Sequence, residues 1–206
     1  MSVAALLLAA GESRRMGRPK ALLPWPFHYG QGTTLLAHQI GALKAAGVDR
    51  VVVVVGHQAA ALRAAVEPLL PGDLTGISWT VNPHYRQGKT TSVKAGLAAL
   101  GAAPCDALLL LNVDQPRTAE TLRHLLAEHR RGESLITIPT CQGKGGHPVV
   151  LHGSLLDELR EIDEATEGLR ALVRRHRDSV RRVAVDAAEV LWDLNTPEQY
   201  QAAVQE

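Results

Sequence analysis

The chain of 206 residues has few aromatic side chains and few cysteines, and each shortage excludes a class of protein. Aromatic residues make up 3% of the sequence, too few for base-stacking platforms or for the aromatic belts of membrane proteins. The two cysteines, Cys105 and Cys141, form neither a CxxC pair nor a metal-ligand spacing. We therefore expect reduced thiols in a cytoplasmic protein.

Long hydrophobic runs and a large net charge are also missing. No apolar run approaches the roughly 18 residues needed to span a bilayer, and the apolar start lacks the flanks of a signal peptide. A net charge of +1 leaves no broad basic face for nucleic acid. The chain contains 46% hydrophobic and 21% charged residues, which is typical of a globular protein. We predict a single domain over residues 1–206 that binds neither nucleic acid nor membrane.

Apolar runs alternate with helical patterns along the chain, which favours an α/β fold: a three-layer, Rossmann-like, mostly parallel sheet flanked by helices. The five consecutive valines at 51–55 predict a strand buried on both faces. Strands are expected over residues 3–9, 51–55, 77–81, 107–111, 135–138, 148–151, 180–185 and 190–194. Helices are expected over 35–46, 58–69, 118–131, 154–162 and 168–176, in a segment through Leu100 after the cap residues 88–92, and from Pro197 onward.

A basic loop follows the first expected strand. The apolar run Val3–Ala10 breaks at Gly11, and four cations follow within nine residues: Arg14, Arg15, Arg18 and Lys20. Glycine allows close backbone approach and clustered cations neutralise phosphate charge, so the loop is typical of a polyanion site. Its spacing matches neither a Walker loop nor a GxGxxG dinucleotide fingerprint. The alternative is a solvated basic turn.

Acidic and amide side chains follow two later strands. Asp114 comes after the apolar run at 108–111, and Asp193 and Asn195 lie near the last expected strand. Because the carboxyl ends of parallel strands share one edge of a sheet, these groups and the basic loop can converge on one cleft. Asp114 with Asp193 or Asn195 would suit Mg²⁺ bound to a triphosphate. The alternative for Asp114 is an Asx turn that caps the next helix.

Five motifs together resemble a known enzyme family. They are LAAGESRRMGRPK at 8–20, LPW at 23–25, DQP at 114–116, GHP at 146–148 and NTPE at 195–198. In this order they resemble the nucleotidyltransferases that mature the molybdenum cofactor, the cytidylyltransferase and guanylyltransferase group. The resemblance implies a fold like that of the nucleotide-diphospho-sugar transferases.

The resemblance also implies roles for individual residues. Arg15, Lys20 and Asp114 would be catalytic, with Arg15 and Lys20 on the triphosphate and Asp114 on Mg²⁺. Either Asp193 or Asn195 would complete the metal site, since many relatives carry aspartate where this chain has Asn195. The nucleotide would contact Ala9, Ala10, Gly11, Asn82, Gly88 and Ser92, and the acceptor would contact Gly146, His147 and Pro148.

The expected reaction is Mg²⁺-dependent transfer of CMP from CTP to the molybdenum cofactor, with release of pyrophosphate, before a molybdoenzyme receives the product. The sequence Ala9-Ala10-Gly11 resembles the cytidylyl members of the family, whereas guanylyl members tend to have a second glycine there. Asn112-Val113 stands where the family often has a glycine beside the aspartate. GTP as donor or a sugar phosphate as acceptor remain alternatives. Two further alternatives are an NAD(P)-dependent oxidoreductase, since some relatives are oxidoreductases, and a non-catalytic carrier of the cofactor.

Overall fold

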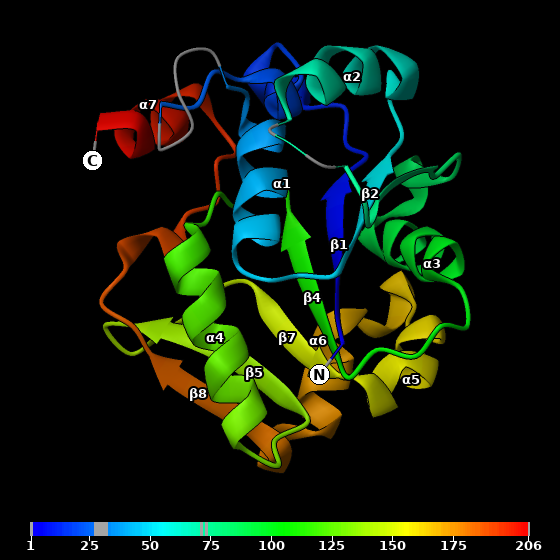
Figure 1. Ribbon diagram of the computed structural model, residues 1–206, viewed down its shortest axis with the longest axis vertical. Helices are drawn as coiled ribbons and strands as arrows, with labels where there is room; N and C mark the ends of the chain where they lie inside the picture. The colour runs from blue at the N-terminus through cyan, green and yellow to red at the C-terminus, as the bar shows by residue number, and fades with distance from the viewer. Residues whose placement is uncertain (1, 27–32, 71, 73, 206) are drawn as a thin grey trace.

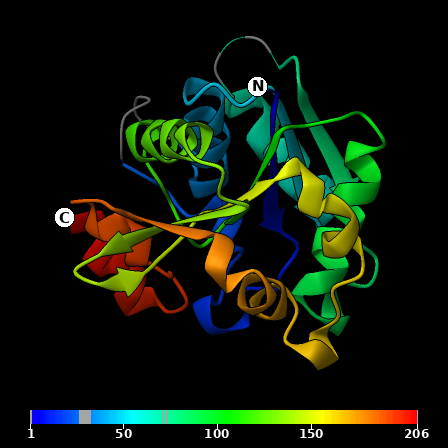
Figure 2. The same cartoon turned by 90° about the horizontal axis from the view of Figure 1, so that it is seen from below.

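A computed structural model describes residues 2–26, 33–70, 72 and 74–205 and consists of one mixed sheet between two layers of helices (Figures 1 and 2). The strand order is β3-β2-β1-β4-β7-β5-β6, with β8 paired to β5. Strands β1 to β4 are parallel to one another, and β7 runs antiparallel to both β4 and β5. The strands are β1 Val3–Ala9, β2 Arg50–Val55, β3 Ile77–Val81, β4 Ala107–Asn112, β5 Ile136–Cys141, β6 Lys144–Gly145, β7 Val149–His152 and β8 Val180–Ala184.

The helices cover both faces of the sheet, which confirms the expected three-layer α/β architecture. Helices α1, α2 and α4 pack on one face, and α3, α5 and α6 on the other. The helices are α1 Leu35–Ala45, α2 Ala59–Val66, α3 Lys89–Leu100, α4 Ala119–Arg131, α5 Leu156–Arg160, α6 Leu169–Arg175 and α7 Pro197–Gln205. None of the helices in the described residues is long and apolar enough to cross a membrane.

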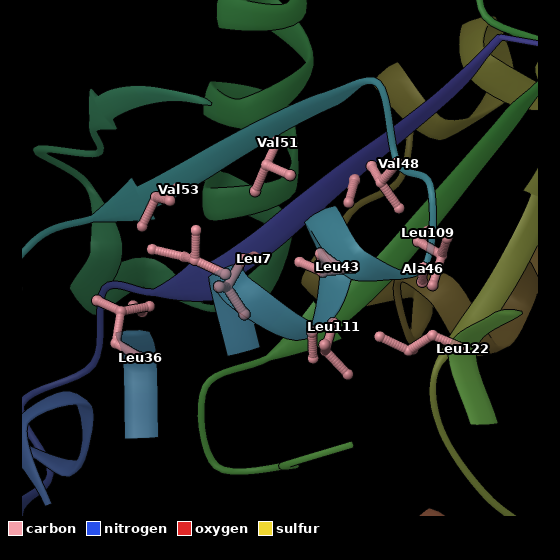
Figure 3. Close-up of a cluster of buried hydrophobic side chains, with 14 of the residues drawn as sticks. Leu7, Leu36, Leu43, Ala46, Val48, Val51, Val53, Leu109, Leu111 and Leu122 are labelled. Atoms are coloured by element: carbon pink, nitrogen blue, oxygen red, sulfur yellow. The ribbon is translucent and has the colours of Figure 1, made fainter. Parts of the chain in front are cut away.

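Alternation along the central strands divides the core into two clusters. Leu7 of β1 faces Leu36 and Leu43 of α1 (Figure 3), whereas its neighbour Leu6 faces α3. Gly96 of α3 allows this second contact, because a Cβ built there would lie 2.9 Å from a methyl carbon of Leu6. The central strands are covered on both faces and are therefore apolar at nearly every position. Polar residues follow in the sequence only where each strand ends.

A third, smaller cluster supports the segment after β1. Trp25 lies at its centre, with its ring 6.3 Å from the rings of both Trp192 and Tyr200. The Tyr200 hydroxyl of α7 donates a hydrogen bond to the carbonyl of Pro24. The C-terminal helix α7 is therefore packed against the same segment that carries the basic loop.

The strand expected over 190–194 is wrong. Ala188–Leu191 forms a 3-10 helix, and residues 192–195 after it belong to no helix or strand. The Val190 carbonyl accepts hydrogen bonds from the His147 backbone N–H and the Arg117 guanidinium, so a strand ladder is not needed to satisfy it. Asp193 and Asn195 therefore come from a loop and not from a strand end.

Candidate active site

The basic loop, residues 11–20, follows β1 and folds back on itself. Ser13 and Gly17 both have positive φ, 54° and 70°, and flank the 3-10 turn Arg14–Met16. The Ser13 hydroxyl accepts the backbone N–H of Lys20 at 2.9 Å, which links the two ends of the loop. Met16 is buried in the Trp25 cluster. The loop is thus held at both ends and at its middle, while its three arginines remain exposed to solvent.

Lys20 lies at the centre of the site. Its Nζ donates to Asp114 Oδ2 at 2.7 Å and to Asn195 Oδ1 at 2.9 Å. Arg15 Nη2 donates to the same Asn195 oxygen at 3.3 Å. The Lys20 and Asp114 side chains are 11% and 15% exposed, so the ion pair is largely shielded from water. Residues separated by 94 and 175 positions in sequence therefore meet at one point, as the sequence pattern indicates.

These groups line a cavity of about 360 Å³, called here the basic cavity. Among the described residues its wall carries five cationic side chains and a single carboxylate, that of Asp114. Such an excess of positive charge favours a polyanionic ligand. The lining consists of Leu8, Ala10, Gly11, Ser13, Arg14, Arg15, Lys20, Tyr85, Arg86, Gly88, Lys89, Ser92, Asn112, Val113, Asp114 and Asn195.

Glu12 connects two walls of the basic cavity. Its carboxylate accepts hydrogen bonds from Arg14 Nε at 2.6 Å, Arg86 Nε at 2.7 Å and the Tyr85 hydroxyl at 3.0 Å. The bonds from Arg14, Arg86 and Tyr85 stabilise the charged form and lower the Glu12 pKa to about 2. Glu12 therefore stays ionised and orients two of the arginines that line the cavity.

Gly56, the residue after β2, allows this bridge to form. A Cβ built on Gly56 would lie 2.8 Å from the carbonyl oxygen of Ala10 and 2.8 Å from the Tyr85 ring. Real Cβ atoms do not approach backbone so closely, so only glycine fits between the two. The Tyr85 ring consequently packs directly over the backbone beside the basic loop.

Two of the residues expected to contact nucleotide lie behind the cavity wall. Asn82 is 2% exposed and donates to Thr91 Oγ1 at 2.8 Å and Ser92 Oγ at 3.0 Å, while its Oδ1 accepts the His84 N–H. Ala9 is buried within β1. By contrast, Ala10, Gly11, Gly88 and Ser92 do line the basic cavity. Asn82 thus orients Ser92 and does not itself face the cavity.

A second cavity of about 440 Å³ adjoins the basic cavity and shares Leu8, Lys89 and Asn112 with it. We call it the mixed cavity, because its lining combines apolar and polar side chains. Its apolar lining is Leu8, Val93, Leu110, Leu111, Ile162 and Leu169, and its polar lining is Lys89, Thr90, Asn112, Gln115, His147, Glu164, Glu167, Arg170 and Asp193, with Gly168 between them.

Of the expected acceptor residues, only His147 lines the mixed cavity. Gly146 instead packs against the backbone of Val190, where an added Cβ would lie 2.3 Å from the carbonyl oxygen. Pro148 leads into β7 through a cis peptide bond. Burial, together with the nearby Arg117 charge, lowers the pKa of His147 below its ordinary value of 6.5. His147 is therefore a neutral ring at neutral pH.

The oxygens of Asp114 and Asn195 converge on a single cation. Lys20 Nζ lies within 3 Å of both, which shows that the two oxygens can bind one positive group together. Carboxylate and amide oxygens are ligands that Mg²⁺ accepts when phosphate and water complete the shell. No cluster of three or more His, Cys, Asp or Glu suited to a metal occurs among the described residues. Asp193 lines the other cavity, where its Oδ1 is 3.5 Å from Gln115 Nε2.

Two features of the site are missing from the sequence-based prediction. One is the set of Glu12, Tyr85 and Arg86, whose partners are more than 70 positions apart. The other is Arg117, which is 1% exposed and beneath the mixed cavity wall. Neither belongs to a motif that stands out in the sequence. A lone acid within a basic loop, Glu12, is the one signal that could have pointed to the first.

Comparisons with known proteins show the family to which the chain belongs. The family described as the MobA-like NTP transferase domain matches residues 5–180. Molybdenum cofactor cytidylyltransferase of Escherichia coli is 29% identical over 95% of this chain and 92% of its own length. Nicotine blue oxidoreductase of Paenarthrobacter nicotinovorans is 31% identical over 96% and 94%. The crystal structure of Rv0371c from Mycobacterium tuberculosis superposes with a TM-score of 0.80 and 27% identity, over 100% of this chain and 99% of that one.

CMP:2-keto-3-deoxy-manno-octonic acid synthetase superposes with a TM-score of 0.73 and 16% identity, over 100% of this chain and 98% of that one. The expected nucleotide-diphospho-sugar transferase fold is confirmed by these two solved structures. The family match covers most of the sheet, the basic loop and Asp114. The chain therefore belongs to the family of MobA-like NTP transferases and is a nucleotidyltransferase.

Proposed function

We propose that the protein transfers CMP from CTP to a phosphate of the molybdenum cofactor and releases pyrophosphate. The observation that carries this proposal is the meeting of Lys20, Asp114 and Asn195 in a cavity that the other cations surround. The similarity over nearly full length to a molybdenum cofactor cytidylyltransferase supports the choice of nucleotide and acceptor.

In this proposal the nucleotide lies in the basic cavity. Ala10, Gly11, Gly88 and Ser92 would contact the nucleotide, since all four line the basic cavity. Arg15 and Lys20 would bind the triphosphate, because phosphate oxygens offer them stronger partners than an amide oxygen does. Ala9 and Asn82 are buried and would not contact the nucleotide; they would support the residues that line the basic cavity, as Asn82 does by its hydrogen bond to Ser92.

We propose Asp114 and Asn195 as the protein ligands of Mg²⁺, with Asp193 outside the metal shell. When bound, the metal would neutralise phosphate charge as pyrophosphate leaves. Lys20 and a divalent cation compete for the same two oxygens. A bound triphosphate would give the ammonium group another partner and so free Asp114 and Asn195 for the metal.

The acceptor lies in the mixed cavity in this proposal. Its apolar side chains suit a ring system, and Lys89 lines both this cavity and the basic cavity. An oxygen of the acceptor phosphate attacks the α-phosphorus of CTP, and the bond from that phosphorus to the β-phosphate oxygen breaks. The attacking phosphate is already ionised, so no general base is required. Neutral His147 would form part of the wall and donate or accept one hydrogen bond.

Acceptor-dependent pyrophosphate release tests the proposal. Purified protein, MgCl₂, each of the four NTPs and molybdopterin cofactor are combined, and release is expected with CTP and cofactor together. Release with GTP would change the nucleotide, and release with a sugar phosphate would change the acceptor. No release with any NTP, together with a thermal shift caused only by NADH or NADPH, would favour the oxidoreductase function that one relative's name describes. CTP binding without turnover would favour a carrier. The cytoplasm as its place of action and a molybdoenzyme as recipient remain part of the proposal.

A further inference from the structure

Arg117 is a buried cation whose hydrogen bonds all go to backbone carbonyl groups. It follows the Asp-Gln-Pro motif after β4 and is 1% exposed. Nε donates to the His147 carbonyl at 2.8 Å and Nη1 to that of Pro116 at 2.6 Å. Nη2 donates to the carbonyls of Val190 at 3.1 Å and Trp192 at 3.3 Å. One planar guanidinium thus binds three separate segments of the chain.

No carboxylate among the described residues forms an ion pair with this guanidinium. Glu189 is the carboxylate with the largest electrostatic effect on Arg117. Its Oε1 accepts hydrogen bonds from the backbone N–H and the hydroxyl of Thr118 instead, both at 2.9 Å. Burial lowers the Arg117 pKa to about 9, which still leaves it protonated at neutral pH. A buried cation without a direct counter-ion is costly, so the charge of Arg117 depends on its hydrogen bonds to the carbonyl groups of these segments.

The three segments that Arg117 binds carry residues of both cavities. The residues at 114–117 include Asp114 of the basic cavity, those at 146–148 include His147, and those at 190–193 include Asp193 of the mixed cavity. Backbone bonds add to the same contact, since the Leu194 N–H donates to the Asp114 carbonyl at 2.8 Å. Arg117 itself lines neither cavity.

We propose that Arg117 is a positioning residue that fixes the mixed cavity relative to the basic cavity, so that the acceptor oxygen is in line with the α-phosphorus. The inference rests on the proposed function and concerns a residue that does not touch substrate. A lysine cannot replace it. The guanidinium is a planar fork whose nitrogens donate in several directions, whereas a single ammonium nitrogen cannot reach all of these carbonyl groups. Misplacement of reacting groups by about 1 Å costs on the order of 10²-fold in rate.

The test uses R117K and R117M, with R123M as the matched control. Arg123 on α4 also donates to a backbone carbonyl, that of Ala45 at 3.0 Å, but is exposed and lines neither cavity. For R117K we expect CTP affinity within about threefold of wild type, kcat for transfer lower by roughly 10²-fold and a higher KM for the acceptor. R117M should show the same pattern more strongly, and R123M should match wild type in all three quantities.

A second variant keeps the test decisive if the Arg117 variants fail to fold. G146A places a Cβ 2.3 Å from the Val190 carbonyl oxygen and displaces the same segments without changing Arg117. It should reproduce the loss of kcat with retained CTP affinity. A wild-type kcat in R117K would overturn the positioning role of Arg117 but not the proposed function. If the arginine variants are unfolded, a wild-type kcat in G146A would do the same. Wild-type protein that transfers no nucleotide overturns the proposed function, and the inference with it.

Discussion

The basic cavity and the mixed cavity share one edge of the sheet, yet different kinds of contact hold them in place. In the basic cavity, charged side chains bind one another directly: Lys20 with Asp114, and Glu12 with Arg14 and Arg86. The mixed cavity is held mainly through backbone, by the His147 and Val190 carbonyl groups that accept from a buried arginine. Ligand binding can therefore rearrange the first set of contacts, whereas the second set forms a fixed frame.

This difference fits the two tasks in the proposed reaction. A triphosphate with its metal brings several charges, and the ion pairs of the basic cavity can exchange partners to accept them. The acceptor must present one oxygen in line with phosphorus, which demands fixed geometry more than charge. Variants of the basic cavity should accordingly alter nucleotide and metal binding, and variants of the mixed cavity should alter the acceptor step.

The largest effect is expected from replacing Asp114. D114N keeps an oxygen near Lys20 but removes the charge needed at the metal, so turnover should fall by about 10³-fold or more, since the electrostatic contribution to phosphoryl transfer is large. D193N should reduce turnover far less and mainly raise the KM for the acceptor, because Asp193 lines the mixed cavity. Steady-state pyrophosphate release measures both, and circular dichroism should show an unchanged fold.

Mn²⁺ affinity measured by calorimetry with a non-hydrolysable CTP analogue separates the two aspartates further. D114N should bind Mn²⁺ weakly and D193N should bind it like wild type. Equal losses in the two variants would make Asp193 a metal ligand and would remove the distinction between the cavities.

The next largest effect is expected from K20M. Loss of a cation on the transferring phosphates should lower kcat by about 10²–10³-fold. In the absence of nucleotide, however, K20M should bind Mn²⁺ more tightly than wild type, because the ammonium group no longer competes for Asp114 and Asn195. K94M is the control, since Lys94 is exposed on α3 and lines neither cavity. Unchanged Mn²⁺ affinity in K20M would show that the ion pair does not obstruct the metal site.

A smaller effect is expected from G56A. The added methyl group would press on the Ala10 carbonyl and the Tyr85 ring, both at 2.8 Å, and so distort one wall of the basic cavity. Overpacking of this kind costs about 1–3 kcal/mol of folding stability and shifts nearby backbone. Because the shifted backbone lines the basic cavity, CTP affinity should fall by about tenfold. The acceptor KM should not change. G132A serves as control, because its Cβ would meet side-chain atoms and no backbone: the end of Arg181 at 3.2 Å and the Ser134 hydroxyl at 3.4 Å. A changed acceptor KM in G56A would indicate that the two cavities are not independent.

Most of the sheet could be predicted from sequence because its central strands are buried on both faces. Runs such as the valines of β2 leave no polar position to obscure the pattern. The segment at 190–194 has a similar apolar pattern, yet its carbonyl groups bond to Arg117 and His147. Hydrophobicity indicates that such a segment is buried but does not reveal which donors satisfy its backbone.

The same limit applies to the candidate site. Lys20 ends the loop after β1, and Asp114 comes just after β4. Because the carboxyl ends of parallel strands lie at one edge of the sheet, the contact between the two side chains could be predicted. Asn82 also follows a strand, but it bonds to its neighbours on α3 and is buried. The role of Arg117 depends on three segments that only the folded chain brings together. The charged residues of the basic cavity could therefore be predicted from local sequence, whereas the backbone contacts that hold the mixed cavity could not.

The smallest effect is expected from His147. Burial and the Arg117 charge lower the pKa of His147 from its ordinary value, so the ring is mainly neutral between pH 7 and 8 and its protonation cannot limit the rate there. H147Q should therefore lower kcat by less than about fivefold, whereas loss of a general base typically costs 10²–10⁴-fold. The plot of kcat against pH should have no limb in that range in either protein. A limb in that range in wild type that disappears in H147Q would make His147 an acid–base group and the mixed cavity a chemical as well as a positioning site.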